Sequence, residues 1–279
     1  MPEIHPFVSG LWNIHLSAQQ SSWFNNGQSF GYIPNKDVNS IFLGSFPVFD
    51  VVHHNHVNGN LAFFYGVVGN RMWPVLSKIS GCDLTNENEI FTLFNQSNFG
   101  ITDVLKEVQR KGQSAADNAL TPIIFNDIID LLYTFPNITN IYVTSGGRGS
   151  VTSNHVHVSG RLREYFNNDD YQHTGFNAIG CKKEIRIYAN QQPVKIFNLI
   201  ALLSPSQTAN VSIQGMINNK ISLQQLIFNL PNQLLPIAET DKVRLLQWSY
   251  FLHSTGFIIR SELREFLNQH QVQLTDIFG

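Results

Sequence analysis

Four short apolar runs, each ending at a Gly, Ser, Pro or Asp, restrict the fold of this chain more than any other feature of its sequence. Ile, Val, Leu and Phe dominate these runs, which is typical of strands buried on both faces of a parallel sheet. Segments with a helical period separate them. This alternation predicts an α/β/α sandwich around a mostly parallel sheet of four to five strands. The runs span residues 40–46, 99–105, 140–146 and 194–203.

Helical segments lie between and after these runs. In residues 121–135, Thr121 is the expected N-cap and Pro122 the first helical residue, a position that tolerates proline. Residues 181–200 predict a hairpin with its turn at 189–193, so one strand runs antiparallel to the others. The expected helices span residues 71–80, 121–135, 160–166, 222–230, 241–253 and 260–270.

The composition narrows the class of protein. A chain of 279 residues, 43% of them hydrophobic, can bury a large core. No run approaches the ~18 apolar residues of a membrane span, and no secretory signal begins the sequence, so we expect a cytoplasmic protein. Cys82 and Cys181 lie far apart and form no CxxC, so neither a disulfide framework nor a thiolate metal site is indicated.

The expected organisation is one core domain with two extensions. Residues 40–255 form the domain, residues 1–39 an N-terminal extension packed on it, and residues 256–279 a C-terminal helical extension. No obligate protein partner is implied, and we expect a monomer.

The net charge of −2 argues against a nucleic-acid partner unless basic residues gather locally, because phosphate binding depends on Lys and Arg. Basic clusters such as those in this sequence are more often solvated faces. If nucleic acid is bound, we expect a positive rim made by Arg110, Lys111, Arg161 and Lys182.

Ligands of open α/β sheets bind outside the carboxyl ends of the strands, so the residues that follow each apolar run are candidates for a site. They are Gly44 to Pro47, Thr102 and Asp103, Ser145 to Gly147, and Ser204 to Ser206.

An aromatic stretch, FFYGVVGNRMWPVL over residues 63–76, ends in a Gly-rich turn with Asn70. Aromatics usually pack in a core, and Gly and Asn favour turns with positive φ. The same residues could also form a pocket that stacks on a flat ligand and holds one polar group over it. Both interpretations stay open on the residues alone.

The order of these motifs resembles the uracil-DNA glycosylase superfamily, nearest its hypoxanthine-DNA glycosylase branch. LGSFP, FFYGVVGNRMWPVL, GITDVL and LLSPSQTAN follow one another as in that family, across roughly residues 40–255. The resemblance implies an α/β/α fold and a monofunctional DNA repair enzyme. Such an enzyme flips a deaminated base, hypoxanthine or uracil, out of DNA and hydrolyses its N-glycosidic bond without metal or cofactor.

The resemblance also implies roles for individual residues. Ser45 and Phe46 replace the Asp or Asn that positions water in several branches. The pattern YGVVGNRMW then makes Asn70 the catalytic residue, because cleavage through an oxocarbenium-like state needs an oriented water. The implied base pocket comprises Gly44, Ser45, Phe46, Pro47, Tyr65, Gly66, Trp73, Thr102, Asp103, Ser145 and Gly146.

Asp103 stands where an Asn often contacts the flipped base. An ionised carboxylate there accepts the ring N–H of the base but cannot donate to a carbonyl. The alternative is a strand-terminal Asp that caps the next turn.

The second superfamily motif implies a loop that presses on the DNA minor groove. Leu203 precedes it in place of a His, and the ending is one residue longer than usual, with Gln207 and Thr208 instead of Pro. The DNA-binding residues would be Ser204, Pro205, Ser206, Gln207 and Asn210.

Two other functions remain open on the sequence. The altered second motif is compatible with a catalytically silent member of the fold that binds nucleic acid or a protein. Alternatively, imidazoles could bind a transition metal in a hydrolase. The metal candidates are His53, His54 and His56, with His155 and His157 further along the chain.

Overall fold

The computed structural model describes residues 1–9, 31–53, 61, 63–114, 116–144, 172–179, 182–189 and 192–279. Its main sheet has six strands in the order β3-β2-β6-β9-β8-β7. The first four run parallel, β8 runs antiparallel to β9, and β7 runs antiparallel to β8 and so in the direction of the first four. This confirms the α/β class and the hairpin with its one antiparallel strand, while the sheet has six strands rather than four to five. The strands are β2 (Ser40–Gly44), β3 (Phe99–Asp103), β6 (Asn140–Val143), β7 (Gln172–Ile179), β8 (Lys182–Ala189) and β9 (Gln192–Ala201).

The central strand β2 is buried along its whole length, as its apolar run predicts. Successive side chains of a strand point to opposite faces, so both faces of the sheet are covered. On one face Phe42 packs against Phe94 of α5 (Glu87–Ser97). Because parallel crossovers are right-handed, α4 (Met72–Ser80) and α5 cover that face and α6 (Ile128–Thr134) covers the other.

The helix expected over residues 121–135 is wrong in its first half. Leu120–Phe125 forms strand β5, which pairs with β4 (Leu105–Arg110), and β1 (Glu3–Ile4) adds to the other edge of β4. The β-branched run that includes Ile123 and Ile124 suits an exposed edge strand, where Pro122 costs no ladder hydrogen bond. The helix begins only after Asp127, whose side chain accepts from the Asp130 N–H.

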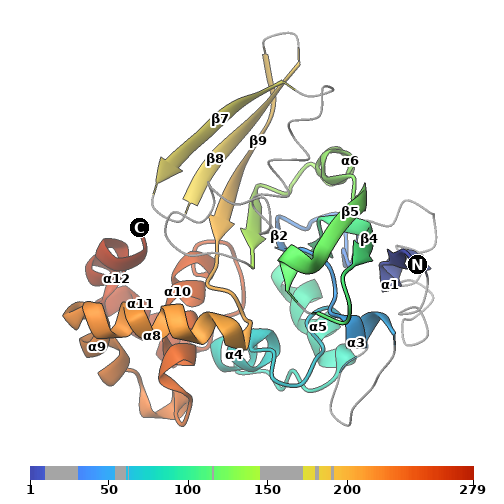
Figure 1. The fold of residues 1–279 in the computed structure, drawn as a ribbon. Coiled ribbons are helices and arrows are strands. Elements are labelled where there is room, and N and C mark those ends of the chain that lie inside the picture. Colours follow the sequence, from blue (N-terminus) through green and yellow to red (C-terminus); the bar gives the residue numbers. More distant parts are fainter. Residues whose placement is uncertain are drawn as a thin grey trace.

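The second half of the chain supplies a group of helices beside α4 (Figure 1). Its centre is α10 (Glu239–Leu252), which packs against α4 and all the other members. Three helices of this group match predicted segments. Its other two helices were not predicted, and neither was α5 in the first half of the chain. The group also contains α8 (Asn210–Asn219), α9 (Ile221–Phe228), α11 (Ser261–Gln269) and α12 (Gln271–Phe278).

Short helical segments complete the described structure, and the helix expected over 160–166 lies outside the described residues. Within those residues no helix is long and apolar enough to cross a membrane. The predicted domain boundaries stay a prediction. The short segments are α1 (Pro6–Ser9), α3 (Phe49–Val52), η2 (Asp117–Ala119), η4 (Gln207–Ala209) and η5 (Asn232–Leu234).

Candidate active site

The carboxyl ends of four parallel strands meet at one edge of the sheet. Asp103, the last residue of β3, pairs with Gly44 at the end of β2. On the other side of β2, the Thr144 N–H donates to Leu43, and the Leu202 N–H donates to Val143 of β6. The first superfamily motif, Gly44 to Pro47, therefore lies beside the GITD segment and the start of the second motif.

Gly44 lets two polar side chains approach the end of β2. A Cβ on this residue would lie 2.0 Å from Asp103 Oδ1 and 2.3 Å from Tyr65 Oη, so a larger residue would displace at least one of these two side chains. Tyr65 has a positive φ of 56°, a strained backbone for a bulky residue, and its hydroxyl lies 2.5 Å from Thr144 Oγ1. The aromatic loop thus delivers Tyr65 to the strand edge.

The N-terminal segment contributes a residue that the sequence did not predict. His5 Nε2 lies 2.8 Å from Asp103 Oδ2, and both side chains are buried. The Phe7 N–H donates to Nδ1 of the same ring at 3.3 Å. The imidazole also packs edge-on against Phe46, a residue of the first motif. Asp103 is therefore bound to a side chain 98 positions away rather than to the turn that follows it.

Burial dominates the electrostatics of this cluster. It raises the pKa of Asp103 to about 8 and lowers the pKa of His5 well below its ordinary value. Burial, and then the charge of Asp103, raise the pKa of the Tyr65 phenol. At neutral pH the three groups are therefore uncharged.

Asn70 ends the aromatic loop directly before α4. Its Oδ1 accepts a hydrogen bond from the Met72 N–H at 2.9 Å, so the side chain caps the helix start. The left-handed turn position expected for Asn70 in the structural alternative is taken by Gly69 instead. Nδ2 makes no hydrogen bond to any residue that the structure describes. Trp73 lies in the core, where its indole N–H donates to the Phe64 carbonyl at 2.9 Å.

The aromatic loop and the second-motif loop touch each other. The Arg71 N–H donates to the Pro205 carbonyl at 2.9 Å. A Cβ on Gly69, whose φ is 91°, would lie 2.7 Å from Gln207 Nε2. Asn70 therefore lies on the same side of the molecule as Ser204, as the predicted convergence of the motifs requires.

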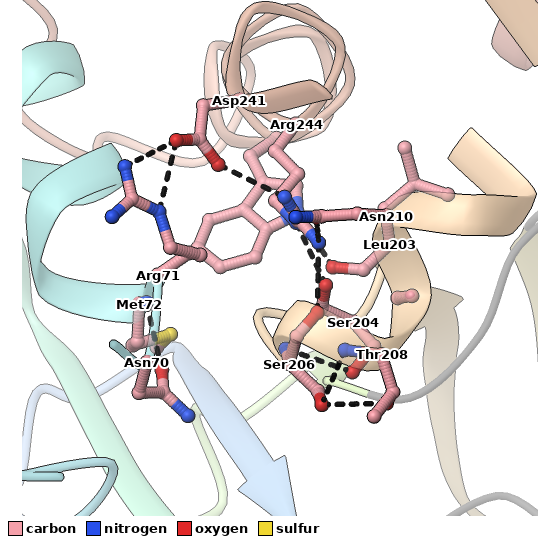
Figure 2. Close-up of polar contacts among 12 residues, drawn as sticks. Asn70, Arg71, Met72, Leu203, Ser204, Ser206, Thr208, Asn210, Asp241 and Arg244 are labelled. Carbon is pink, nitrogen blue, oxygen red and sulfur yellow. Dashed lines mark hydrogen bonds and ion pairs between the residues drawn. The ribbon is translucent and has the colours of Figure 1, made fainter. Parts of the chain in front are cut away.

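Helix α10 holds the second-motif loop in place (Figure 2). Arg244 donates to the carbonyls of Ser204 and Ser206 at 2.8 and 2.9 Å, and to Asn210 Oδ1 at 2.8 Å. Gln247 accepts from the Leu203 N–H at 2.6 Å. These contacts fix the backbone of the loop, which is a requirement for any surface that must present groups to a ligand in fixed positions.

A carboxylate joins this loop to the aromatic loop. Asp241 of α10 binds Arg71 through Oδ2 and Arg244 through Oδ1, as Figure 2 shows. Asp241 is only 3% exposed, so its carboxylate is shielded from water between the two guanidinium groups. Together with the Arg71–Pro205 bond, it forms a closed ring of contacts between the two loops.

Gln207 and Thr208, which distinguish the second motif from its usual form in the family, lie in a defined turn. Gln207–Ala209 forms one turn of 3₁₀ helix, and Ser206 caps it by accepting from the Thr208 N–H at 3.3 Å. Ser204 Oγ accepts from the Ser206 N–H at 3.2 Å. The serine hydroxyls therefore shape the loop, and its extra residue is absorbed in this turn.

Some predicted pocket residues serve other purposes. Thr102 faces the opposite side of β3 from Asp103, and its hydroxyl accepts from Asn126 Nδ2 at 2.8 Å. Its place in the pocket stays a prediction. The Gly66 N–H and carbonyl both close the aromatic loop on itself. The hydroxyl of Ser45 donates to Asp117. Ser145 and Gly146 lie outside the described residues.

The predicted positive rim is wrong for Arg110. Its side chain is buried, bonds Glu3 at 2.8 Å and donates to the Pro47 carbonyl at 2.6 Å, so it stabilises the first motif instead. Lys111 and Lys182 are exposed, as a rim requires, and Arg161 lies outside the described residues.

The metal alternative is tested only in part. His53 contacts Glu3 at 3.4 Å, while His54, His56, His155 and His157 lie outside the described residues. Within the described ranges, no three His, Cys, Asp or Glu side chains gather as metal ligands.

The unpredicted residues left weak signals in the sequence. Arg244 and Gln247 stand three apart in a helix that is otherwise apolar on most sides, a pattern that indicates buried polar groups with assigned partners. His5 stands between Ile4 and Phe7, and nothing in that spacing identifies Asp103 as its partner.

Comparison with known proteins adds little to this description. No protein-family model matches the sequence, and no curated protein is significantly similar to it. Among solved structures, the chain is similar to a candidate uracil DNA glycosylase from Methanosarcina acetivorans that was solved by NMR in solution. The identity is 18%, the match covers 47% of this chain and 71% of that chain, and the TM-score of 0.35 is too low to support an argument.

Proposed function

We propose that this protein is a DNA glycosylase that hydrolyses the N-glycosidic bond of a deaminated base flipped out of DNA. The observation that carries the proposal is the meeting of the motifs at one sheet edge. The first motif, the aromatic loop, Asp103 and the second-motif loop are far apart in sequence, yet they form one connected set of contacts. Ligands of open α/β sheets bind at this edge.

Each part of the edge has a role in this proposal. Gly44, Phe46 and Tyr65 border the base, and Asp103 contacts its polar edge. The loop from Ser204 to Asn210 presses on the DNA and offsets the cost of flipping, which is about a few kcal/mol. The rigid attachment of this loop to α10 supports that role, because a loop that is already ordered loses little entropy on binding.

Asn70 orients the water that attacks the sugar. An amide oxygen has two lone pairs, and the Met72 N–H takes only one of them. The second lone pair and the Nδ2 protons remain able to bind a water. The proposal includes no metal or cofactor, as the family resemblance implies.

Base release from defined oligonucleotides tests this function. We expect single-turnover release of hypoxanthine, uracil or xanthine from single- or double-stranded DNA, with no loss of activity in a chelator. Binding of the DNA without release from any of the three would support the silent-binder alternative. Activity that disappears with the chelator and returns with a metal ion would support the metal hydrolase.

Two variants of Asn70 separate catalysis from helix capping. Asn70→Ala should lower base release by about 10²-fold, the scale for loss of one preorganised polar group. It should also cost about 1 kcal/mol of unfolding free energy through the lost cap. Asn70→Ser retains a capping oxygen, so it should restore the stability but not the rate. A serine variant as active as the wild type would show that Asn70 only caps α4.

A further inference from the structure

The two oxygens of Asp103 face different partners. Oδ2 accepts from His5, whereas Oδ1 lies on the side of Gly44 and Tyr65, where the proposed base pocket begins. The inference drawn from this asymmetry rests on the proposed function and deepens it, since it concerns the chemical group of the base that the pocket recognises.

The imidazole of His5 can only donate to Asp103. Its Nδ1 accepts from the Phe7 N–H, so the ring proton is on Nε2 and points at Oδ2. A proton on Asp103 must therefore be carried by Oδ1. The ring is fixed from the other side by Phe46 and Phe64, so it cannot turn to offer a different atom.

We propose that Asp103 recognises the flipped base as a neutral carboxylic acid, donating Oδ1–H to a carbonyl of the base, and that His5 is a positioning residue that holds Oδ2 and directs the proton to Oδ1.

The surroundings of Asp103 favour the neutral acid. Among the described residues no guanidinium or ammonium group pairs with it, since Arg110 behind Phe46 is bound to Glu3. The acid is 3% exposed, and its burial raises its pKa to about 8. The titratable and charged groups that face the cluster are His5 on the N-terminal segment, Tyr65 on the aromatic loop, Glu3 and Arg110 on the small sheet, and Asp117 between strands β4 and β5 of that sheet.

A neutral acid discriminates between deaminated bases and their parents. Deamination replaces an amino group by a carbonyl, so the product accepts a hydrogen bond where the parent base donates one. Oδ1–H satisfies the carbonyl and meets an N–H donor of adenine or cytosine with another donor. The ionised carboxylate would favour the opposite pairing. Recognition of the deaminated base should therefore be lost as Asp103 ionises.

The pH dependence of base release tests this proposal. In single-turnover assays on hypoxanthine and uracil duplexes, the wild-type rate should fall as the pH rises through about 8. Asp103→Asn places an amide N–H where the acid has its proton, so it should retain the rate within a few-fold and abolish this fall. Asp103→Ala should lose at least about 10-fold at every pH, because it removes the donor. Asp83→Asn, an exposed carboxyl, should leave the profile unchanged.

The role of His5 has its own pH signature. The N–H that His5 donates to Oδ2 stabilises the ionised form of Asp103. His5→Phe removes this donor, so the pKa of Asp103 should rise and the fall in rate should move to higher pH. His5→Gln keeps an N–H donor and should return the profile toward the wild type. A merely structural role would change the rate in both variants without moving the profile. His253→Gln serves as the matched control.

The outcomes separate this inference from the function on which it rests. A wild type that releases no base at any pH overturns both. An active wild type with a flat profile through pH 8, or an Asp103→Asn variant as weak as Asp103→Ala, overturns only the neutral-acid inference. If Asp103→Ala does not fold, infrared spectra of the wild type and of Asp103→Asn test the neutral-acid inference instead. A protonated-carboxyl band present in the wild type at pH 7 and missing from Asp103→Asn supports the inference, and its absence from the wild type overturns it.

Discussion

Asp103 and Asp241 are both 3% exposed, and they lie in the two halves of the candidate site. Their partners differ completely. Asp241 stands between the guanidinium groups of Arg71 and Arg244, whereas Asp103 faces an imidazole that burial keeps neutral. Burial alone therefore does not decide what a carboxyl group does. The partner decides whether the group anchors a loop as an ion or remains able to exchange a proton.

The two halves have correspondingly different mechanical roles. The half around Asp241 is a set of ionic hydrogen bonds that fix loop backbones, and such charge-assisted bonds are strong and geometrically specific. The half around Asp103 contains a glycine without room for a side chain and a tyrosine with a strained backbone. Strain and shifted pKa values gather at functional sites, so we expect chemistry in this half and support in the other.

Removing Arg244 should break the ionic half most severely. Arg244→Ala leaves the carbonyls of Ser204 and Ser206 without their donor, inside a buried ionic cluster. We expect a loss of about 3–5 kcal/mol in the free energy of unfolding, measured by urea denaturation. Arg264→Ala, which removes an exposed arginine of α11, should change this free energy by less than about 0.5 kcal/mol. Similar values for the two variants would show that the cluster does not anchor the loop.

The stability of the Asp103 half should depend on pH. Between about pH 4 and 8 the folded protein binds a proton at Asp103 that the unfolded chain releases, so stability decreases as pH rises. His5 acts in the opposite direction, because its folded pKa is lowered, but only below its ordinary value of 6.5. From pH 6.5 to 8 only Asp103, of these two groups, therefore changes the stability.

Asp103→Asn should remove this dependence. Relative to the wild type, the variant should gain about 1.4 kcal/mol of stability per pH unit between 6.5 and 8, or roughly 2 kcal/mol over the interval. Denaturation of both proteins at several pH values measures the difference, with Asp83→Asn as the control. A constant difference across this range would mean that Asp103 is already ionised in the folded protein.

Thr102 provides the smallest test, because it borders Asp103 in sequence but faces away from it. Thr102→Val removes the acceptor of the Asn126 side chain, which retains its bond to the Asp103 carbonyl. We expect a cost of about 1 kcal/mol and no change in single-turnover base release. The exposed Thr92→Val is the matched control for stability. A large loss of activity at constant stability would support the predicted place of Thr102 in the pocket.

The parallel strands were predictable because a run buried on both faces has few alternatives. The strand that replaces the helix expected from Thr121 was not predictable, because the apolar run around Ile123 suits either a helix or a strand. Its pairing with β4 makes it a strand. The site was predictable in outline, since carboxyl strand ends share one edge. Its buried partners were not: the bond from His5 to Asp103 spans 98 positions and that from Arg71 to Asp241 spans 170, and no local pattern records such distances.

The pairing of β1 with β4 joins two segments that are synthesised at different times. His5 leaves the ribosome 98 residues before Asp103. At a synthesis rate of about 5–20 residues per second, its segment waits roughly 5–20 s for a partner. The apolar side chain of Phe7, which packs against Phe64, likewise waits for a segment that is made later. The contact between His5 and Asp103 therefore cannot form before the end of β3 is made, whereas the contact between Arg71 and Asp241 has to wait until α10 is made, so the recognition half of the candidate site can assemble before the half that anchors its loops.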